Sequence, residues 1–100
     1  MTPILAGNVV HSVRTFTALT GGNVNPSTVV VTVTDPAGTT VELANPQITY
    51  NADDTALTVT VDWVLADDAA QGWWTITHDV TGSMVAAHQE AIPVQARIAP

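Results

Sequence analysis

The stretch Val29-Val30-Val31-Thr32-Val33-Thr34 decides the fold class of this chain. Every odd-numbered position holds valine, whereas the even-numbered positions hold one valine and two threonines. An apolar residue at every second position is typical of a β-strand with one buried face, and β-branched residues favour strands. The sequence therefore predicts a strand whose odd-numbered valines face a core.

The residues that follow this strand predict a hairpin. Asp35-Pro36-Ala37-Gly38 has turn residues in turn order, because proline presets its own backbone angle and Gly38 can adopt a positive φ. A returning strand is therefore expected from Thr39 to Leu43.

Two further stretches alternate in the same way. Residues 57–63 place Leu57, two valines and Trp63 on one parity, after a turn at 51–54. Residues 73–79 follow Gly72, and we expect Trp74 and Ile76 to face inward there.

The remaining segments have weaker patterns. A last strand is expected from about Val85 to Val94, with an open edge or a bulge at Pro93, which has no amide hydrogen. A first strand from Asn8 to Leu19 has apolar residues on both parities, which predicts a bulge or a change of sheet. Residues 64–71 predict a loop with at most one helical turn.

These signals together predict an all-β fold. About seven short strands in 100 residues are typical of a two-sheet antiparallel, immunoglobulin-like β-sandwich. The length predicts a single domain over residues 1–100. We expect a short N-terminal arm at residues 1–7 and a C-terminal arm at residues 95–100.

Composition excludes several classes of function. The net charge is −7, with two arginines and no lysine, so binding to nucleic acid or to an anionic membrane surface is not expected. A partner surface should be neutral or basic. The absence of cysteine excludes disulfides, thiolate zinc sites and a cysteine nucleophile. No stretch has the length of a membrane span or the pattern of a signal peptide, so an intracellular origin is expected.

The residues that could take part in catalysis are better interpreted as structural. The three histidines, His11, His78 and His88, have no metal-binding spacing, and His78 shares the inward parity of Ile76. His88 and Glu90 could serve acid–base chemistry only in a pocket, which a flat sheet face does not offer. We therefore expect no enzyme activity and no cofactor.

Two acidic doublets leave calcium binding open. Asp53-Asp54 and Asp67-Asp68 lie in expected loops, where calcium sites at sandwich ends gather oxygen ligands. The EF-hand spacing is absent, so solvated turn residues are the preferred interpretation.

The candidate interface residues are an outward tryptophan and the two arms. Trp73 has the outward parity of its strand, which suits an interface anchor or, alternatively, a carbohydrate-stacking platform. Ile4 and Leu5 of the first arm and Arg97 and Ile98 of the second are the other candidates.

The order of the turn and core signals resembles that of small immunoglobulin-like structural proteins of tailed bacteriophages, notably those of actinobacteria. The matching positions lie along most of the chain: Phe16, Asn25-Pro26-Ser27-Thr28-Val29, Asp35-Pro36-Ala37-Gly38-Thr39, Asp54-Thr55, Gly72, Trp74, Ile76, Glu90, Ile92 and Val94. Leu57 departs from the group, in which an aromatic residue is frequent there.

This resemblance implies a non-enzymatic structural role in a virion. The expected form is a capsid decoration protein, made in the host cytoplasm and located on the capsid surface. Its expected partners are the lattice of the major capsid protein and neighbouring copies of itself, in a homo-oligomer or symmetric array. A head–tail connector or tail subunit, and a carbohydrate- or host-surface-binding module, are the alternatives.

Overall fold

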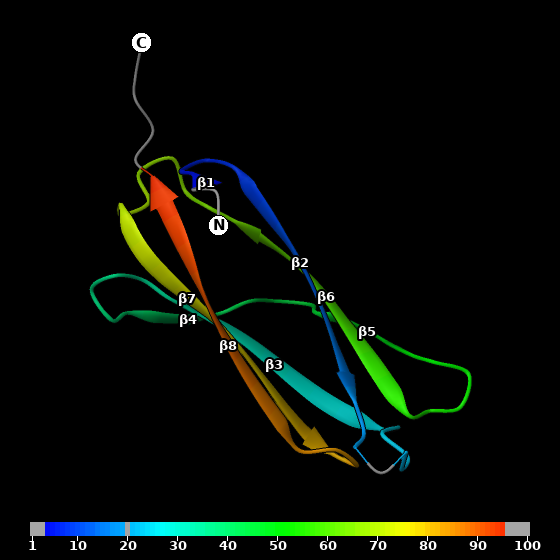
Figure 1. The fold of residues 1–100 in the computed structure, drawn as a ribbon. Helices are drawn as coiled ribbons and strands as arrows, with labels where there is room; N and C mark the ends of the chain where they lie inside the picture. Colours follow the sequence, from blue (N-terminus) through cyan, green and yellow to red (C-terminus); the bar gives the residue numbers. More distant parts are fainter. Residues whose placement is uncertain (1–3, 20, 96–100) are drawn as a thin grey trace.

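The computed structural model describes residues 4–19 and 21–95 (Figure 1). These residues form eight strands and no helix. The strands are β1 (Ile4–Leu5), β2 (Val9–Thr17), β3 (Ser27–Thr34), β4 (Thr40–Glu42), β5 (Gln47–Tyr50), β6 (Ala56–Val64), β7 (Gly72–Gly82) and β8 (Ala86–Gln95). No helix among the described residues is long and apolar enough to cross a membrane.

The strands form two sheets that lie face to face. The larger sheet has the order β1-β8-β7-β3-β4, and the smaller one has the order β2-β6-β5. Every pairing is antiparallel except that of β1 with β8. The two-sheet all-β sandwich is thus confirmed, with eight described strands where about seven were expected. The immunoglobulin-like subclass stays a prediction, and the orders β2-β6-β5 and β3-β7-β8 agree with it.

The core lies between the sheets and is built from the expected parities. Val31, Leu57 and Val59 are each 0% exposed, and Trp63 and Ile76 are also buried. The alternation in β3 and β6 therefore predicted the inner face of both strands correctly. Burial of such aliphatic side chains is the main driving force for the fold.

The expected N-terminal arm is wrong for the part that the structure describes. Ile4 and Leu5 form β1 and pair in parallel with Val94 and Gln95 of β8. The amide of the buried Ala6 donates a hydrogen bond to the carbonyl of Gln95 at 3.0 Å. Gln95, expected as the start of an arm, is therefore the last residue of a sheet strand. Residues 1–3 and 96–100 lie outside the described residues.

The predicted bulge in the first strand is also wrong. β2 pairs with β6 without interruption, from Val9 opposite Val64 to Thr17 opposite Ala56. Its mixed pattern has another cause, because β2 is an edge strand whose outward side chains include exposed valines.

Two further details agree with the sequence, and one strand was not predicted. Pro93 lies where β8 has an open edge, since β1 pairs only with the two residues after it. Residues 65–71 form a loop, in which the amide of Ala69 donates to the carbonyl of Ala66. The sequence analysis missed β5, a strand of four residues that directly follows Pro46.

Candidate functional site

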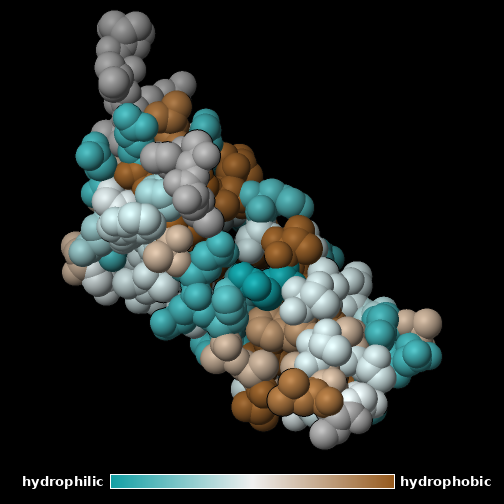
Figure 2. Space-filling view, viewed as in Figure 1, coloured by the Kyte–Doolittle hydropathy of each residue, from teal (hydrophilic) through white to brown (hydrophobic). Residues whose placement is uncertain are grey.

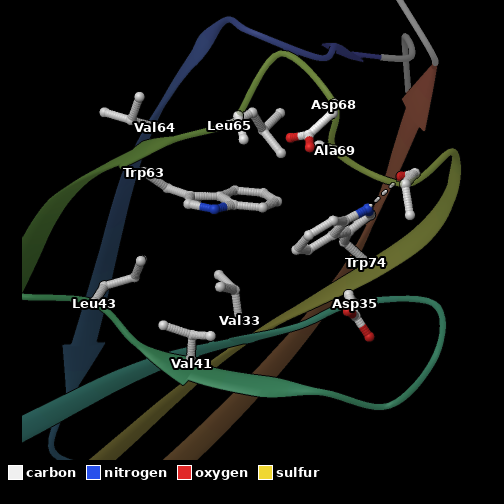
Figure 3. Close-up of a pocket in the computed structure, with 12 residues that line it drawn as sticks. Val33, Asp35, Val41, Leu43, Trp63, Val64, Leu65, Asp68, Ala69 and Trp74 are labelled. Atoms are coloured by element: carbon white, nitrogen blue, oxygen red, sulfur yellow. Dashed lines mark hydrogen bonds between the residues drawn. The ribbon is translucent and has the colours of Figure 1, made fainter.

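An apolar groove lies at one end of the sandwich (Figure 3). It has a volume of about 500 Å³ and lies between the β3–β4 hairpin and the β6–β7 connection. Val33 and Val41 line the hairpin side, and Leu65 and Ala69 line the opposite side. We call this hollow the tryptophan groove, because Trp63 and Trp74 lie between its two sides.

The two indole rings lie close together in the groove. Trp63 and Trp74 lie with ring centroids 5.3 Å apart and planes tilted by 49°, a favourable aromatic geometry. Trp74 Nε1 donates a hydrogen bond to the carbonyl of Ala70 at 2.8 Å. This bond ties Trp74 to the β6–β7 connection and leaves part of its ring free to line the hollow.

Two carboxylates lie around the tryptophan groove. Asp35 accepts hydrogen bonds from the amides of Ala37 and Thr39, at 3.0 and 2.8 Å, so it holds the hairpin turn. Asp68 is exposed and also lines the hollow. An apolar, aromatic floor with acidic residues beside it suits an aliphatic group or a cationic side chain.

The groove was not predicted from the sequence, although its two tryptophans were singled out. Parity assigned Trp63 and Trp74 to inner faces of different strands, which is correct. The contact between them depends on how the two sheets are placed, and no local pattern encodes that placement.

Trp73 lies where its parity predicts, on the outer face of the larger sheet. It is 64% exposed and lies opposite Pro93 on β8. A shallow hollow of about 370 Å³ includes both residues, together with Gln71 and Gln95. An exposed tryptophan next to amide side chains provides both a stacking surface and hydrogen-bonding groups.

The structure brings one other interface candidate close to Trp73. Leu5 is 45% exposed and pairs with Gln95, which belongs to the Trp73 hollow. Ile4 instead packs against the core and is partly buried. Arg97 and Ile98 lie outside the described residues, so their predicted role stays a prediction.

A polar cluster interrupts the core between β2, β7 and β8. His78 is 1% exposed, and neither of its ring nitrogens has a hydrogen-bond partner among the described residues. Its ring lies 6.2 Å from that of Phe16 and 6.5 Å from that of His88. Burial lowers the pKa of His78, and the nearby charges of Arg14 and His88 lower it further. His78 is therefore a neutral core residue, and its side chain faces inward as its parity predicted.

The pair His88 and Glu90 also belongs to the inner side of its strand. Both side chains are partly buried, and Nε2 of His88 is buried without a hydrogen-bond partner in the described part of the chain. Glu90 lies 3.8 Å from the guanidinium of Arg14 on β2. The expectation of a flat sheet face without a hollow was therefore wrong, because Glu90 lines a hollow and forms an ion pair between the sheets.

The acidic doublets do not gather into a metal site. Within residues 4–19 and 21–95, no group of three histidine, aspartate or glutamate side chains could hold a metal ion. Asp54 accepts a hydrogen bond of 3.4 Å from the side-chain amide of Asn25, which connects two turns.

Comparisons with protein-family models, curated proteins and solved structures give no match to this chain.

Proposed function

We propose that this protein is a non-enzymatic structural component of a virion, a capsid decoration protein that binds the lattice of the major capsid protein. The observation that carries the proposal is the exposed Trp73 on the outer face of a sheet whose surface is poor in charge. Large aromatic residues contribute strongly to protein interfaces. The resemblance to small structural proteins of tailed bacteriophages supports the same role.

The acidic surface favours a particular kind of contact in this role. The chain has a net charge of −7, so its copies repel one another weakly in solution and are attracted to basic patches on a lattice. Repetition of the same contact by the symmetry of a capsid adds avidity, which makes a small interface per copy sufficient.

The test is rebinding to capsids that lack this protein. Purified protein is mixed with the stripped particles, and the bound fraction is measured after sedimentation of the capsids. The Trp73→Ala variant should lose binding by about tenfold or more, because removal of an interface anchor costs about 2 kcal/mol.

A matched control separates loss of contact from loss of fold. Val85 is 82% exposed and lies beyond the opposite end of β7. Val85→Ala should bind as the unmodified chain does, and both variants should keep its thermal midpoint. A stable ring of fixed size that ignores capsids would contradict decoration and favour a head–tail connector.

A second function, carbohydrate binding, is favoured by one specific observation. Trp73 shares its hollow with Gln71 and Gln95, so an aromatic face and two amides lie together. A sugar ring could stack on the indole while its hydroxyls bond to the amides. A glycan array screens for binding, and calorimetric titration with any glycan that binds tests the role of the indole: Trp73→Phe should retain binding and Trp73→Ala should lose it.

A further inference from the structure

Among the described residues, β2 is a long edge strand of the sandwich with no strand paired on its outer side. It has nine residues, or about 30 Å of strand, and contains no proline, lysine or bulge. The edge strands β4 and β5 have three and four residues, and the open part of β8 includes Pro93. Short strands and proline are the usual protections against edge-to-edge pairing, and β2 is the longest edge among the described residues that has neither.

The backbone groups that β2 presents at this edge follow from its pairing with β6. At the two ends of the ladder, the amide of Leu65 donates to the carbonyl of Asn8, and the amide of Ala18 donates to that of Thr55. Hydrogen-bonded positions alternate in an antiparallel pair. Even-numbered residues of β2 therefore bond to β6, and the odd-numbered residues direct their N–H and C=O groups to the free edge.

Two of the five side chains at these odd positions are exposed valines. Val9 is 59% exposed and Val13 is 57% exposed. Figure 2 shows hydrophobic residues at the surface of the sandwich among hydrophilic ones. β2 carries no acidic residue, so its edge is also less repulsive to another copy than the rest of this acidic chain.

The sequence of β2 is complementary to itself in one antiparallel register. With Val13 opposite Val13 of a second copy, His11 lies opposite Thr15 and Val9 lies opposite Thr17. All of these are odd positions, so each free N–H and C=O meets a partner. No like charges face each other directly, which would be destabilising.

A hollow beside β2 lies where this register would bring an inward-facing side chain of the second copy. It has a volume of about 270 Å³ and is lined by Ile4, Val10, Ser12 and Glu90, among others. In the register centred on Val13, Arg14 of the second copy lies opposite Ser12, next to this hollow. The carboxylate of Glu90 already lies 3.8 Å from the chain's own Arg14, so it can also attract the second arginine.

We propose that two copies of this chain associate through β2, in an antiparallel pair centred on Val13. The three-stranded sheets of the two copies then form one continuous sheet of six strands. The interface is isologous, as expected for a twofold dimer. This inference goes beyond the proposed virion role and does not depend on it, because self-association is measured on the purified protein alone.

The first test is the mass in solution over a range of concentrations, by sedimentation velocity. We expect twice the mass of the 10.4 kDa chain at the highest concentrations. Val13→Lys places two ammonium groups opposite each other on the twofold axis and should raise the dissociation constant about tenfold or more. Val13→Thr keeps a β-branched residue at this position and should keep the dimer.

Val64→Lys is the matched control. Val64 is at least as exposed as Val13 but lies on β6, away from the edge. A monomer at every concentration would overturn the proposal. Equal weakening by the Val13 and Val64 lysine variants would also overturn it, and so would an oligomer that Val13→Lys leaves intact.

A covalent test fixes the register. The chain has no cysteine, so Val13→Cys introduces a single thiol at the centre of the proposed pair. Opposite residues at a hydrogen-bonded position have Cα atoms about 5.5 Å apart, within the range that a disulfide spans. Mild oxidation should crosslink Val13→Cys quantitatively and Val64→Cys at least about tenfold more slowly; equal rates would contradict the register.

Discussion

β3 and β2 are strands of similar length, but the division between an apolar inner face and a polar outer face is strict only in β3. In β3 the inward positions are buried valines, and most outward positions are threonine. In β2 the inward row includes Ser12 and Arg14, whereas Val9 and Val13 point outward and are more than half exposed.

The difference follows from the places of the two strands. β3 lies between β7 and β4, so its inward side chains are enclosed and a polar group there would lack water. β2 lies at the edge of the smaller sheet, where Arg14 remains 35% exposed while it pairs with Glu90. Strict alternation is therefore required of a central strand and is relaxed at an edge.

The largest expected effect on stability is that of shortening a buried valine of β3, compared with an exposed valine of β2. Val31→Ala removes two methyl groups from a site that is 0% exposed and should lower the free energy of unfolding by about 2 kcal/mol. Val13→Ala on β2 should change it by less than about 0.5 kcal/mol. Urea unfolding measures both, at a concentration where the chain is monomeric. Equal losses would contradict the distinction between the two strands.

The next largest effect on the free energy of unfolding is expected at His78. This polar residue lies directly opposite Val31 in the apolar part of the sheet. Its two unpartnered nitrogens carry a desolvation cost. His78→Leu should therefore raise the free energy of unfolding by about 1 kcal/mol at pH 7. A loss of stability would show that the imidazole has a partner that the fold needs.

The same residue predicts a pH dependence. Burial, with Arg14 and His88, lowers the pKa of His78, and Glu90 and Asp79 oppose this shift. The unfolded chain then takes up a proton at higher pH than the folded chain does. Stability should be fully present above about pH 6.5 and should fall as the pH falls below that value. Urea unfolding at pH 7.5 and 5.5 should show this loss in the unmodified chain and in His11→Gln, and a smaller loss in His78→Leu.

The smallest effect concerns the ion pair at the edge. Arg14 and Glu90 are each more than one-third exposed, and their closest charged atoms are 3.8 Å apart. A double-mutant cycle with Arg14→Gln and Glu90→Gln should give a coupling of about 0.5 kcal/mol or less, weaker at high salt. A coupling several times larger would mean that the inner side of β2 is as enclosed as that of β3.

Patterns of neighbouring residues correctly predicted which side chains of β3 and β6 face the core, and where the first hairpin turns. The valines of residues 29–33 and the alternation from Leu57 to Trp63 placed the inner faces of β3 and β6 correctly, because neighbouring side chains in a strand point to opposite faces. The hairpin after Thr34 and the outward side chain of Trp73 follow from turn chemistry and from parity.

Only the tertiary structure decided which distant segments meet. The parallel pairing of Ile4 with Val94, the contact of Trp63 with Trp74 and the ion pair of Arg14 with Glu90 each join segments far apart in the chain. β5 escaped notice because four residues after a proline are too few to show a period. The sequence by itself determined the class of fold and the direction of most core side chains, since these depend on neighbouring residues. The groove, the polar cluster and the open edge of β2 depend on how two sheets are ordered and stacked, which no local period encodes.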